Sequence, residues 1–313
     1  MNVMLLAAGL GTRLKPLTLK YPKPAVPLLN LPLGLYQFQY LKHIEISKLI
    51  VNTFHLPEKI RALYQNQPYY KNEIIFSNES EKILGGAGGL KKASSAMTSN
   101  EPILLMNADE VYFTKNKDFL KKALHQHIQN KNLATVVVIE HPEAGKKFGA
   151  LWAEDLKIKD ISKTARHEHL KPWHCIGPIF LSWDVLKLIP EETESNIFYD
   201  VLLIELSKNQ VEIFPIEAEW YETGNPQDYF SATRAILENL DSETHQFINQ
   251  YDESDLIRND QTLSFVSTAQ NLNRDQLQGL NVISKTNTSP LNDLIKDSVL
   301  FDQEILNSNY FKT

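Results

Sequence analysis

The chain has 313 residues, 42% of them hydrophobic, which is enough for one large α/β domain with a substantial core plus an appendage. Its 38 acidic and 32 basic side chains give a formal net charge of -6, which argues against a nucleic-acid partner and requires a local basic site for any anionic substrate. The single cysteine, Cys175, excludes an internal disulfide, and no apolar run reaches the length of a membrane span. We therefore expect a soluble, cytoplasmic protein without a membrane partner.

The first predicted element is a buried strand over residues 3–8, a short apolar run bounded by a glycine turn. Gly9 and Gly11 then free the backbone to adopt positive φ and to approach a ligand closely. Successive amides in such a turn form a concavity for phosphate oxygens, and Arg13 and Lys23 add positive charge beside it. These residues predict a phosphate-binding loop.

Two better-known phosphate loops do not fit this segment. The dinucleotide fingerprint has a third glycine where Leu14 stands, and Pro16 prevents a helix from starting there. A Walker A loop needs Gly-Lys-Ser or Gly-Lys-Thr after four spacers, and the sequence has no such run. The remaining pattern is G-x-G-T-R-x-x-P-x-T over residues 9–18 with P-K-P at 22–24, and it resembles the signature of the sugar-1-phosphate nucleotidyltransferases.

This resemblance implies a Rossmann-like α/β fold, with a mixed, mostly parallel sheet flanked by helices. It also implies that a nucleoside triphosphate contacts the first strand and its loop, at Leu6, Ala8, Gly9, Gly11, Thr12 and Arg13. The next segments agree with such a fold, because residues 32–47 have apolar residues at helical spacing and Pro57 opens a short helix to about residue 67. Residues 48–54 and 73–76 predict buried strands, and this alternation indicates βαβ units and a parallel sheet.

A second glycine cluster, L-G-G-A-G-G-L, occupies residues 84–90. Each glycine costs about 1 kcal/mol relative to alanine in a helix. The cluster therefore indicates either a close approach of the backbone to a base or ribose, or a flexible surface turn. Residues 79–88 resemble the base-binding loop of the mannose-1-phosphate guanylyltransferase and N-acetylmuramic acid 1-phosphate uridylyltransferase branches, which implies nucleotide contacts for Glu79, Gly85 and Gly88. Gly86 departs from this pattern, in which threonine is common.

The next predicted strand covers residues 103–106 and ends in N-A-D-E at 107–110. Ligands of open parallel sheets bind beyond the carboxyl ends of the strands, which is where Asp109 falls. A carboxylate there can hold Mg²⁺ through oxygen, or it can cap the following turn. The resemblance implies the first role, because the metal-binding aspartate of the family ends this strand. Glu110 ranks second, because it is expected to point elsewhere.

After a polar helix over residues 115–131 and a β-branched strand over 133–139, the pattern changes to short strands, at 148–151, 158–162 and 176–181. In the family this region forms a smaller sheet that holds the sugar phosphate. A longer helix is predicted over residues 195–207, with Ser195 as its cap.

The resemblance implies a set of residues at the sugar phosphate, namely Lys23, Gly149, Lys163, Gly177 and Asp200. Two departures leave the identity of the sugar open. The common Glu-Lys-Pro is replaced by S-K-T-A at residues 162–165, and Cys175 stands where asparagine is frequent.

The motif W-Y-E-T-G-N-P at residues 220–226 resembles the family's Trp-x-Asp-x-Gly-x-Pro, whose acid is a second metal ligand. Here that acid is Glu222, so Asp109 and Glu222 form the predicted clamp for Mg²⁺, the one expected cofactor. Asn225 is predicted to cap a helix that Pro226 opens and that ends near residue 240.

We expect a catalytic domain over residues 1–240 and a C-terminal linker and extension over 241–313. Residues 242–275 are polar with weak periodicity, which predicts a linker or loosely packed helices. Residues 277–313 contain L-N-V-I and D-S-V-L-F, which resemble relics of the left-handed β-helix that some family members append, without its hexapeptide repeat. Such a degenerate extension would cap the main domain or join copies in a homo-oligomer.

The resemblance implies transfer of a nucleoside monophosphate from a nucleoside triphosphate to a sugar 1-phosphate, with guanine and mannose as the favoured pair. Catalysis would then consist of positioning and charge neutralisation, because both substrates are anions. Arg13 would bind the β and γ phosphates, and Lys23 the α-phosphate and the incoming phosphate. Mg²⁺ on Asp109 and Glu222 would bridge the α-phosphate and the attacking oxygen. The alternative is a regulatory protein that binds nucleotides or nucleotide sugars with little turnover.

Overall fold

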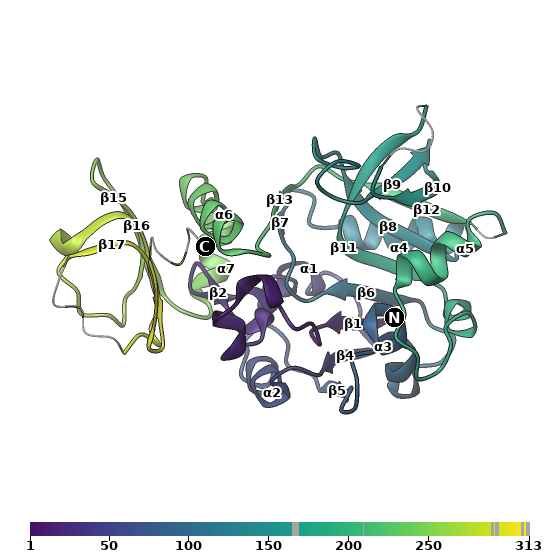
Figure 1. Ribbon diagram of the computed structural model, residues 1–313, viewed down its shortest axis with the longest axis horizontal. Coiled ribbons are helices and arrows are strands. Elements are labelled where there is room, and N and C mark those ends of the chain that lie inside the picture. The colour runs from purple at the N-terminus through teal and green to yellow at the C-terminus, as the bar shows by residue number, and fades with distance from the viewer. Residues whose placement is uncertain (165–168, 209, 289–290, 292–293, 308–309, 311–313) are drawn as a thin grey trace.

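The protein is described by a computed structural model that covers residues 1–164, 169–208, 210–288, 291, 294–307 and 310. Nine strands form the central sheet, β1 (Asn2–Leu6), β4 (Lys48–Thr53), β5 (Ile74–Asn78), β6 (Ile103–Asn107), β8 (Ala134–Ile139), β9 (Ala150–Glu154), β10 (Lys157–Ser162), β11 (Lys171–Leu181) and β12 (Val211–Pro215). Their order is β5-β4-β1-β6-β11-β8-β12-β10-β9 (Figure 1). The predicted α/β class is confirmed.

Strand β1 is buried on both faces of this sheet. Val3 and Leu5 belong to the core on one face, and Met4 belongs to the core on the other. Two-sided burial explains the continuous apolar run, since neither face of the strand meets water. Because β1 pairs in parallel with both β4 and β6, the carboxyl ends of these strands meet at one edge of the sheet.

The sheet is mixed rather than mostly parallel. Strands β5, β4, β1 and β6 form a parallel block, and β8 is parallel to β12. In contrast, β11 runs antiparallel to β6, β8 and β9, and β10 runs antiparallel to β9 and β12. The smaller sheet expected from the short strands is not formed, because β11 joins them to the main sheet.

The helices are α1 (Phe38–Leu41), α2 (Pro57–Gln65), α3 (Gly85–Ala93), α4 (Phe119–Gln129), α5 (Leu203–Glu205), α6 (Pro226–Glu238) and α7 (Ser242–Asn249), with a π-helical stretch at Ile197–Leu202. Short 3-10 turns occupy Thr12–Leu14, Leu17–Leu19, Lys23–Ala25, Leu33–Leu35, Ser94–Ala96, Trp183–Lys187 and Arg274–Gln276. Two-stranded ribbons pair β2 (Pro27–Leu28) with β3 (Leu31–Pro32), and β7 (Val111–Phe113) with β13 (Glu219–Tyr221).

The predicted helices at α2, α4 and α6 are confirmed. The Asn225 side chain caps α6 by accepting a hydrogen bond from the Asp228 amide at 2.9 Å. The predicted helix over residues 32–47 is wrong, since this segment holds only a 3-10 turn and the one-turn α1. Asn196 rather than Ser195 caps the π-helical stretch, because the Ser195 backbone pairs with the start of α3.

Beyond α7 the chain forms a second sheet, in the order β14 (Ser254–Arg258), β15 (Thr262–Ser267), β16 (Leu277–Ile283), β17 (Ile295–Phe301) and β18 (Glu304–Leu306). Strands β15, β16 and β17 are parallel, and the two edge strands are antiparallel. Residues 242–275, expected as a linker or loosely packed helices, hold one helix, α7, followed by the strands β14 and β15, which were not expected. The domain boundary at residue 240 and the relation of this sheet to a left-handed β-helix stay predictions.

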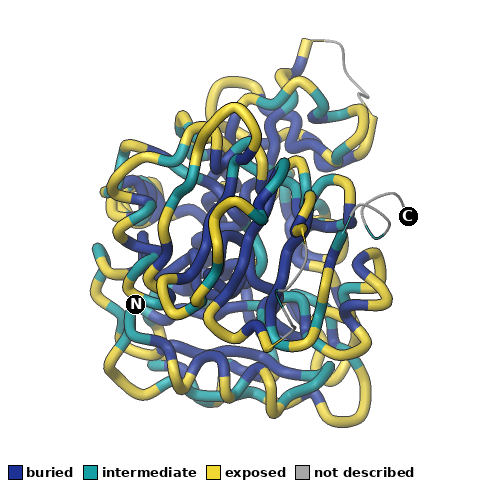
Figure 2. The backbone as a smooth tube through the Cα atoms, turned by 90° about the vertical axis from the view of Figure 1, so that its left-hand side faces the viewer, coloured by how far each residue is buried: buried dark blue, intermediate teal, exposed yellow. Residues whose placement is uncertain are grey.

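The second sheet packs against the first part of the chain. Phe265, Val282 and Phe301 belong to the same buried cluster as Leu5 and Leu28. Figure 2, which views the molecule from the side of the second sheet, shows buried backbone in the interior and exposed backbone at the turns. Within the described residues, none of the helices has both the length and the apolar character needed to cross a membrane.

Candidate active site

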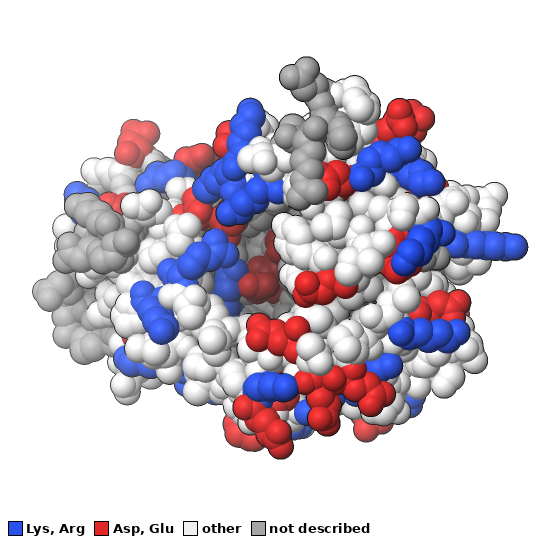
Figure 3. Space-filling view, turned by 45° about the vertical axis from the view of Figure 1, so that its right-hand side comes forward, with Lys and Arg blue, Asp and Glu red and all other residues white. Residues whose placement is uncertain are grey.

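A cavity of about 450 Å³ opens at the edge of the main sheet where β1, β4, β5 and β6 end. Its walls come from these strand ends, the glycine loop after β1, the start of α3 and the turn after β13. The lining residues are Leu6, Ala7, Ala8, Gly9, Gly11, Thr12, Arg13, Lys23, Pro24, Asn52, Glu79, Ile83, Gly85, Gly86, Asn107, Asp109, Glu110, Trp220, Glu222, Thr223 and Gly224. Figure 3 shows a hollow with basic side chains along one wall and acidic side chains at its back.

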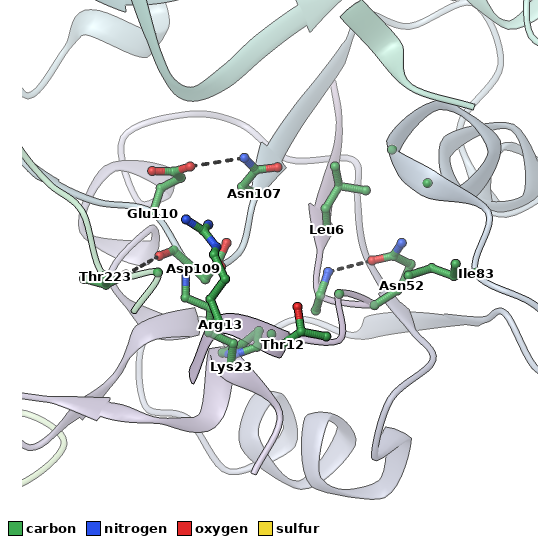
Figure 4. A pocket seen from close by; sticks show the side chains of 18 of the residues that line it. Leu6, Thr12, Arg13, Lys23, Asn52, Ile83, Asn107, Asp109, Glu110 and Thr223 are labelled. Atoms are coloured by element: carbon green, nitrogen blue, oxygen red, sulfur yellow. Dashed lines mark hydrogen bonds and ion pairs between the residues drawn. The ribbon is translucent and has the colours of Figure 1, made fainter. Parts of the chain in front are cut away.

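Gly11 shapes the loop after β1. It has a φ of +59°, in the left-handed region, and a Cβ there would lie 2.9 Å from Cγ2 of Thr18. The Thr18 hydroxyl donates to the Gly11 carbonyl oxygen at 2.8 Å, and the Leu14 amide donates to the same oxygen at 3.0 Å. The loop therefore folds back on itself and carries Arg13 to the cavity (Figure 4).

Lys23 and Asp109 form an ion pair in the cavity. Lys23 Nζ lies 2.7 Å from Asp109 Oδ2, and the two side chains are 14% and 27% exposed. One residue comes from the P-K-P turn and the other from the end of β6, so the fold joins two distant parts of the chain. Partial shielding from water makes this pair stronger than a fully exposed one.

The ends of the Glu222 and Arg13 side chains both lie next to Gly224. A Cβ on Gly224 would lie 2.5 Å from Glu222 Oε1 and 2.7 Å from Arg13 Nη2, so any larger residue there would displace these two side chains. The Gly224 amide donates to Glu222 Oε1 at 2.6 Å, which turns this carboxylate back onto its own turn. The Thr223 hydroxyl makes a long hydrogen bond of 3.5 Å to the Asp109 carbonyl oxygen, which joins this turn to the end of β6.

Asp109 and Glu222 supply only oxygen ligands to this cavity, and such ligands suit a hard cation such as Mg²⁺. Mg²⁺ is commonly held by one or two carboxylates together with substrate phosphates. In the part of the chain that the structure describes, no three or more His, Cys, Asp or Glu side chains are grouped so as to hold a metal by themselves. A cation here would therefore depend on substrate oxygens for part of its coordination.

Glu110 follows Asp109 but occupies another part of the wall (Figure 4). Its Oε2 accepts a hydrogen bond from Trp220 Nε1 at 2.7 Å, and its Oε1 accepts one from Asn107 Nδ2 at 3.2 Å. Desolvation, followed by repulsion from Asp109, raises the pKa of the Glu110 carboxyl above its ordinary value. Glu110 thus points away from Asp109, as expected, yet it lines the same cavity.

Trp220 connects Glu110 to an aromatic cluster. Its ring centroid lies 4.3 Å from that of His174, 5.3 Å from Phe148 and 5.7 Å from His141. His174 is 8% exposed, and among the described residues neither of its ring nitrogens has a hydrogen-bond partner. Burial, followed by repulsion from His141, lowers the pKa of His174 to about 4, so its ring is neutral at pH 7.

Asn52 is a site residue that the sequence analysis missed. Its Oδ1 accepts from the Ala7 amide at 2.6 Å, and its Nδ2 donates to Glu79 Oε1 at 2.7 Å. Glu79 Oε2 accepts from the Leu84 amide at 2.7 Å, so the network ties the ends of β1, β4 and β5 to the start of α3. Glu79, predicted to contact the nucleotide, lines the cavity, but it is 1% exposed and both its oxygens are bonded within the protein. The only signal for Asn52 was an amide near the end of a buried strand.

The predicted glycines of α3 differ in their surroundings. Gly85 lines the cavity with a φ of +68°, and a Cβ there would lie 2.6 Å from the Ser195 carbonyl oxygen. A Cβ on Gly88 would collide with the Thr193 carbonyl oxygen, and Gly88 is not among the described residues that line the cavity. Gly88 therefore lets α3 pack closely against residues 193–195.

Four residues predicted at the sugar phosphate do not belong to the described lining of the cavity, namely Gly149, Lys163, Gly177 and Asp200. Gly149 and Lys163 are exposed. Asp200 Oδ2 accepts a hydrogen bond from the Asn196 amide at 2.7 Å, and the Asp200 amide donates to the Asn196 carbonyl oxygen at 3.1 Å. These two bonds give Asp200 a structural role at the start of the π-helical stretch.

Comparison with known sequences extends over most of the chain. The profile of the nucleotidyl transferase family matches residues 2–239. Mannose-1-phosphate guanyltransferase of Saccharomyces cerevisiae is 28% identical over 253 residues, which are 77% of this chain and 66% of that protein. UTP–glucose-1-phosphate uridylyltransferase of Synechocystis is 27% identical over 250 residues, which are 76% of this chain and 63% of that protein. The chain thus spans about two thirds of the length of these relatives.

Solved structures share the fold. HddC from Yersinia pseudotuberculosis, complexed with GMP-PN, aligns with a TM-score of 0.59 at 21% identity, over 75% of this chain and 99% of that one. UDP-glucose pyrophosphorylase from Acinetobacter baumannii aligns with a TM-score of 0.64 at 15% identity, over 79% and 96%. Since the family profile covers the whole main sheet and its cavity, the chain belongs to the nucleotidyl transferase family.

Proposed function

We propose that the protein transfers a nucleoside monophosphate from a nucleoside triphosphate to a sugar 1-phosphate and releases pyrophosphate. The observation that carries this proposal is the cavity at the carboxyl edge of the main sheet, which gathers Arg13, Lys23 and Asp109 in one place. A reaction between two anions needs such fixed charges more than it needs a nucleophilic side chain.

In this reaction a phosphate oxygen of the sugar 1-phosphate bonds to the α-phosphorus of the triphosphate. The bond from that phosphorus to the oxygen bridging to the β-phosphate breaks, and pyrophosphate leaves with its electron pair. The attacking phosphate is already an anion at neutral pH, so no side chain has to remove a proton from it.

Each charged residue has a role in this scheme. Arg13 binds the β and γ phosphates as a planar fork, and Lys23 binds the α-phosphate and the incoming phosphate as a point charge. Asp109 and Glu222 would hold Mg²⁺, which, when bound, neutralises phosphate charge as a Lewis acid. The glycines of the two loops let the backbone approach the phosphates, ribose and base.

The proposed substrates are GTP and mannose 1-phosphate. The similarity to proteins named mannose-1-phosphate guanyltransferase supports this pair. The similarity at 27% identity to a UTP–glucose-1-phosphate uridylyltransferase supports a second pair, UTP and glucose 1-phosphate. The test is pyrophosphate release in the presence of Mg²⁺, with GTP, UTP, dTTP, CTP and ATP each combined with mannose, glucose and N-acetylglucosamine 1-phosphates. Highest kcat/KM with GTP and mannose 1-phosphate is expected, and faster release with another pair would replace this assignment.

A nucleotide-binding regulator is the second candidate. It is favoured by Glu222, whose carboxylate bonds to the Gly224 amide, and by the ion pair that already occupies Asp109. Nucleotide binding without pyrophosphate release on every pair would support it. A cytoplasmic location, the lack of nucleic-acid and membrane partners, and assembly through residues 241–313 stay predictions.

A further inference from the structure

Glu110 is an acidic residue in a cavity that we propose binds two anionic substrates. Figure 4 shows Glu110 and Asn107 on the opposite side of the opening from Lys23 and Thr12. Among the described residues, no Lys, Arg or His nitrogen lies within ion-pair distance of its carboxylate, whereas Asp109 pairs with Lys23 at 2.7 Å. A carboxylate without a cation would repel phosphates, so Glu110 is expected to face a neutral part of the substrates.

The carboxylate of Glu110 has acceptor capacity to spare. Among the described residues, it accepts two hydrogen bonds, both from neutral donors, Trp220 Nε1 at 2.7 Å and Asn107 Nδ2 at 3.2 Å. A carboxylate accepts about four hydrogen bonds, so each oxygen keeps a lone pair for a further donor. The hydroxyl groups of a sugar ring are neutral donors of this kind.

Glu110 is also held in a fixed position from three directions. Its carbonyl oxygen accepts from Gln37 Nε2 at 2.7 Å, and Trp220 is packed in the aromatic cluster of His141, Phe148 and His174. Gly177 lies behind it with a φ of +116°, and a Cβ at Gly177 would lie 3.1 Å from Glu110 Cγ. Such support is what a site needs in order to discriminate between similar ligands.

We propose that Glu110 accepts hydrogen bonds from hydroxyl groups of the sugar ring and thereby selects the sugar, with Trp220 as a positioning residue. This inference rests on the proposed function. A site built to bond a substrate hydroxyl rejects the analogue that lacks it, because a buried polar group is then left without its partner. Gly177, predicted at the sugar phosphate, would contribute indirectly by giving Glu110 its place.

The test compares Glu110→Gln with the wild type on the best pair from the substrate panel and on the matching monodeoxy sugar 1-phosphates. Glu110→Gln should lower kcat/KM for the sugar phosphate about 10- to 100-fold, the value of a charged hydrogen bond, and leave the KM for the nucleotide unchanged. The wild type should discriminate strongly against at least one deoxy sugar, and the variant should lose that discrimination. Glu140→Gln, an exposed carboxylate paired with Lys171, serves as the matched control and should change neither value.

The possible outcomes separate the two proposals. If Glu110→Gln keeps the wild-type discrimination between sugars, Glu110 does not bond the sugar hydroxyl groups. The same conclusion follows if the variant loses affinity for Mn²⁺ in titration calorimetry while the KM for the sugar phosphate is unchanged. In both cases the proposed function still stands. If the wild type releases no pyrophosphate on any pair, the proposed function fails and this inference fails with it. If Glu110→Gln does not fold, the same comparison is made with Glu110→Asp, whose shorter side chain keeps the charge but moves the carboxylate away from the sugar.

Discussion

Asp109 is the residue whose charge the proposed chemistry depends on most. Its replacement in Asp109→Asn keeps the shape of the side chain but removes the partner of Lys23 and a predicted metal ligand. We expect kcat to fall by at least about 100-fold, which corresponds to roughly 3 kcal/mol of transition-state stabilisation. The measurement is steady-state pyrophosphate release, with the exposed Asp184→Asn as control. An Asp109→Asn enzyme that turns over at the wild-type rate would refute the role of this residue.

The buried imidazole of His174 predicts a pH dependence of stability. Its pKa, lowered by burial to about 4, lies below the ordinary value of 6.5, so the unfolded chain binds the proton more tightly. The contribution of His174 is fully present above pH 6.5 and is lost as the pH falls towards 4, by up to about 3 kcal/mol.

His174→Phe should therefore flatten the fall in the free energy of unfolding between pH 7 and pH 5, measured by urea titration. Part of the slope will remain, because burial also lowers the pKa of His127 to about 4. A slope equal to that of the wild type would show that His174 is not buried as described.

At the scale of elements, the packing of α3 against residues 193–195 requires Gly88. In Gly88→Ala the new methyl group would meet the Thr193 carbonyl oxygen, so the helix has to shift at a cost of about 1–3 kcal/mol. In Gly86→Ala the Cβ would lie 3.4 Å from Leu6 Cδ1, an ordinary contact, and alanine favours the helix by up to about 1 kcal/mol. Chemical denaturation should thus show Gly88→Ala destabilised and Gly86→Ala equal to or above the wild type. The reverse order would contradict the described packing.

The elements also show what could be predicted from the sequence. Strands β1, β4 and β6 are buried on both faces, so their apolar runs were visible without the structure. Strands β14 and β15 were missed because polar residues lie inside them. Ser264 is fully buried, and its hydroxyl bonds to Thr262 and to Asn281 of the neighbouring strand. Once polar side chains satisfy one another in this way, the alternation that marks a strand disappears from the sequence.

The residues of the candidate site were predictable where they belong to sequence motifs that resemble those of the family. Arg13, Lys23, Asp109 and Glu222 line one cavity although they come from four parts of the chain. Asn52 was not predictable, because its role depends on two partners, the Ala7 amide and the Glu79 carboxylate, that only the fold brings near it. Lys163 was placed by resemblance in a segment whose sequence departs from the family, and it lies on the surface instead.

At the scale of the whole molecule, the second sheet packs on the segment after β1, residues 9–24, which carries the G-x-G-T-R and P-K-P motifs. Lys20 Nζ lies 2.6 Å from Glu304 Oε1, the rings of Tyr21 and Phe301 have centroids 5.3 Å apart, and the Tyr310 hydroxyl donates to the Leu14 carbonyl oxygen at 3.0 Å. The loop that carries Arg13 is therefore supported from behind by the last part of the chain.

Phe301→Ala should accordingly destabilise the entire protein in one transition, by about 3–5 kcal/mol, since Phe301 is 3% exposed in the shared core. Ile305→Ala, at a side chain that is 51% exposed, should have little effect. Calorimetry would contradict this view if the variant unfolded in two steps, with the larger one at the wild-type temperature.

The most direct test of the central claim is pyrophosphate release by the wild-type protein, with a nucleoside triphosphate and a sugar 1-phosphate both present, before and after removal of divalent cations. We predict release with Mg²⁺, no release in excess EDTA, and recovery when Mg²⁺ is restored, because phosphate charge in the cavity must be neutralised by a cation as well as by Arg13 and Lys23. A protein that binds nucleotides with Mg²⁺ but releases no pyrophosphate from any pair would contradict the account.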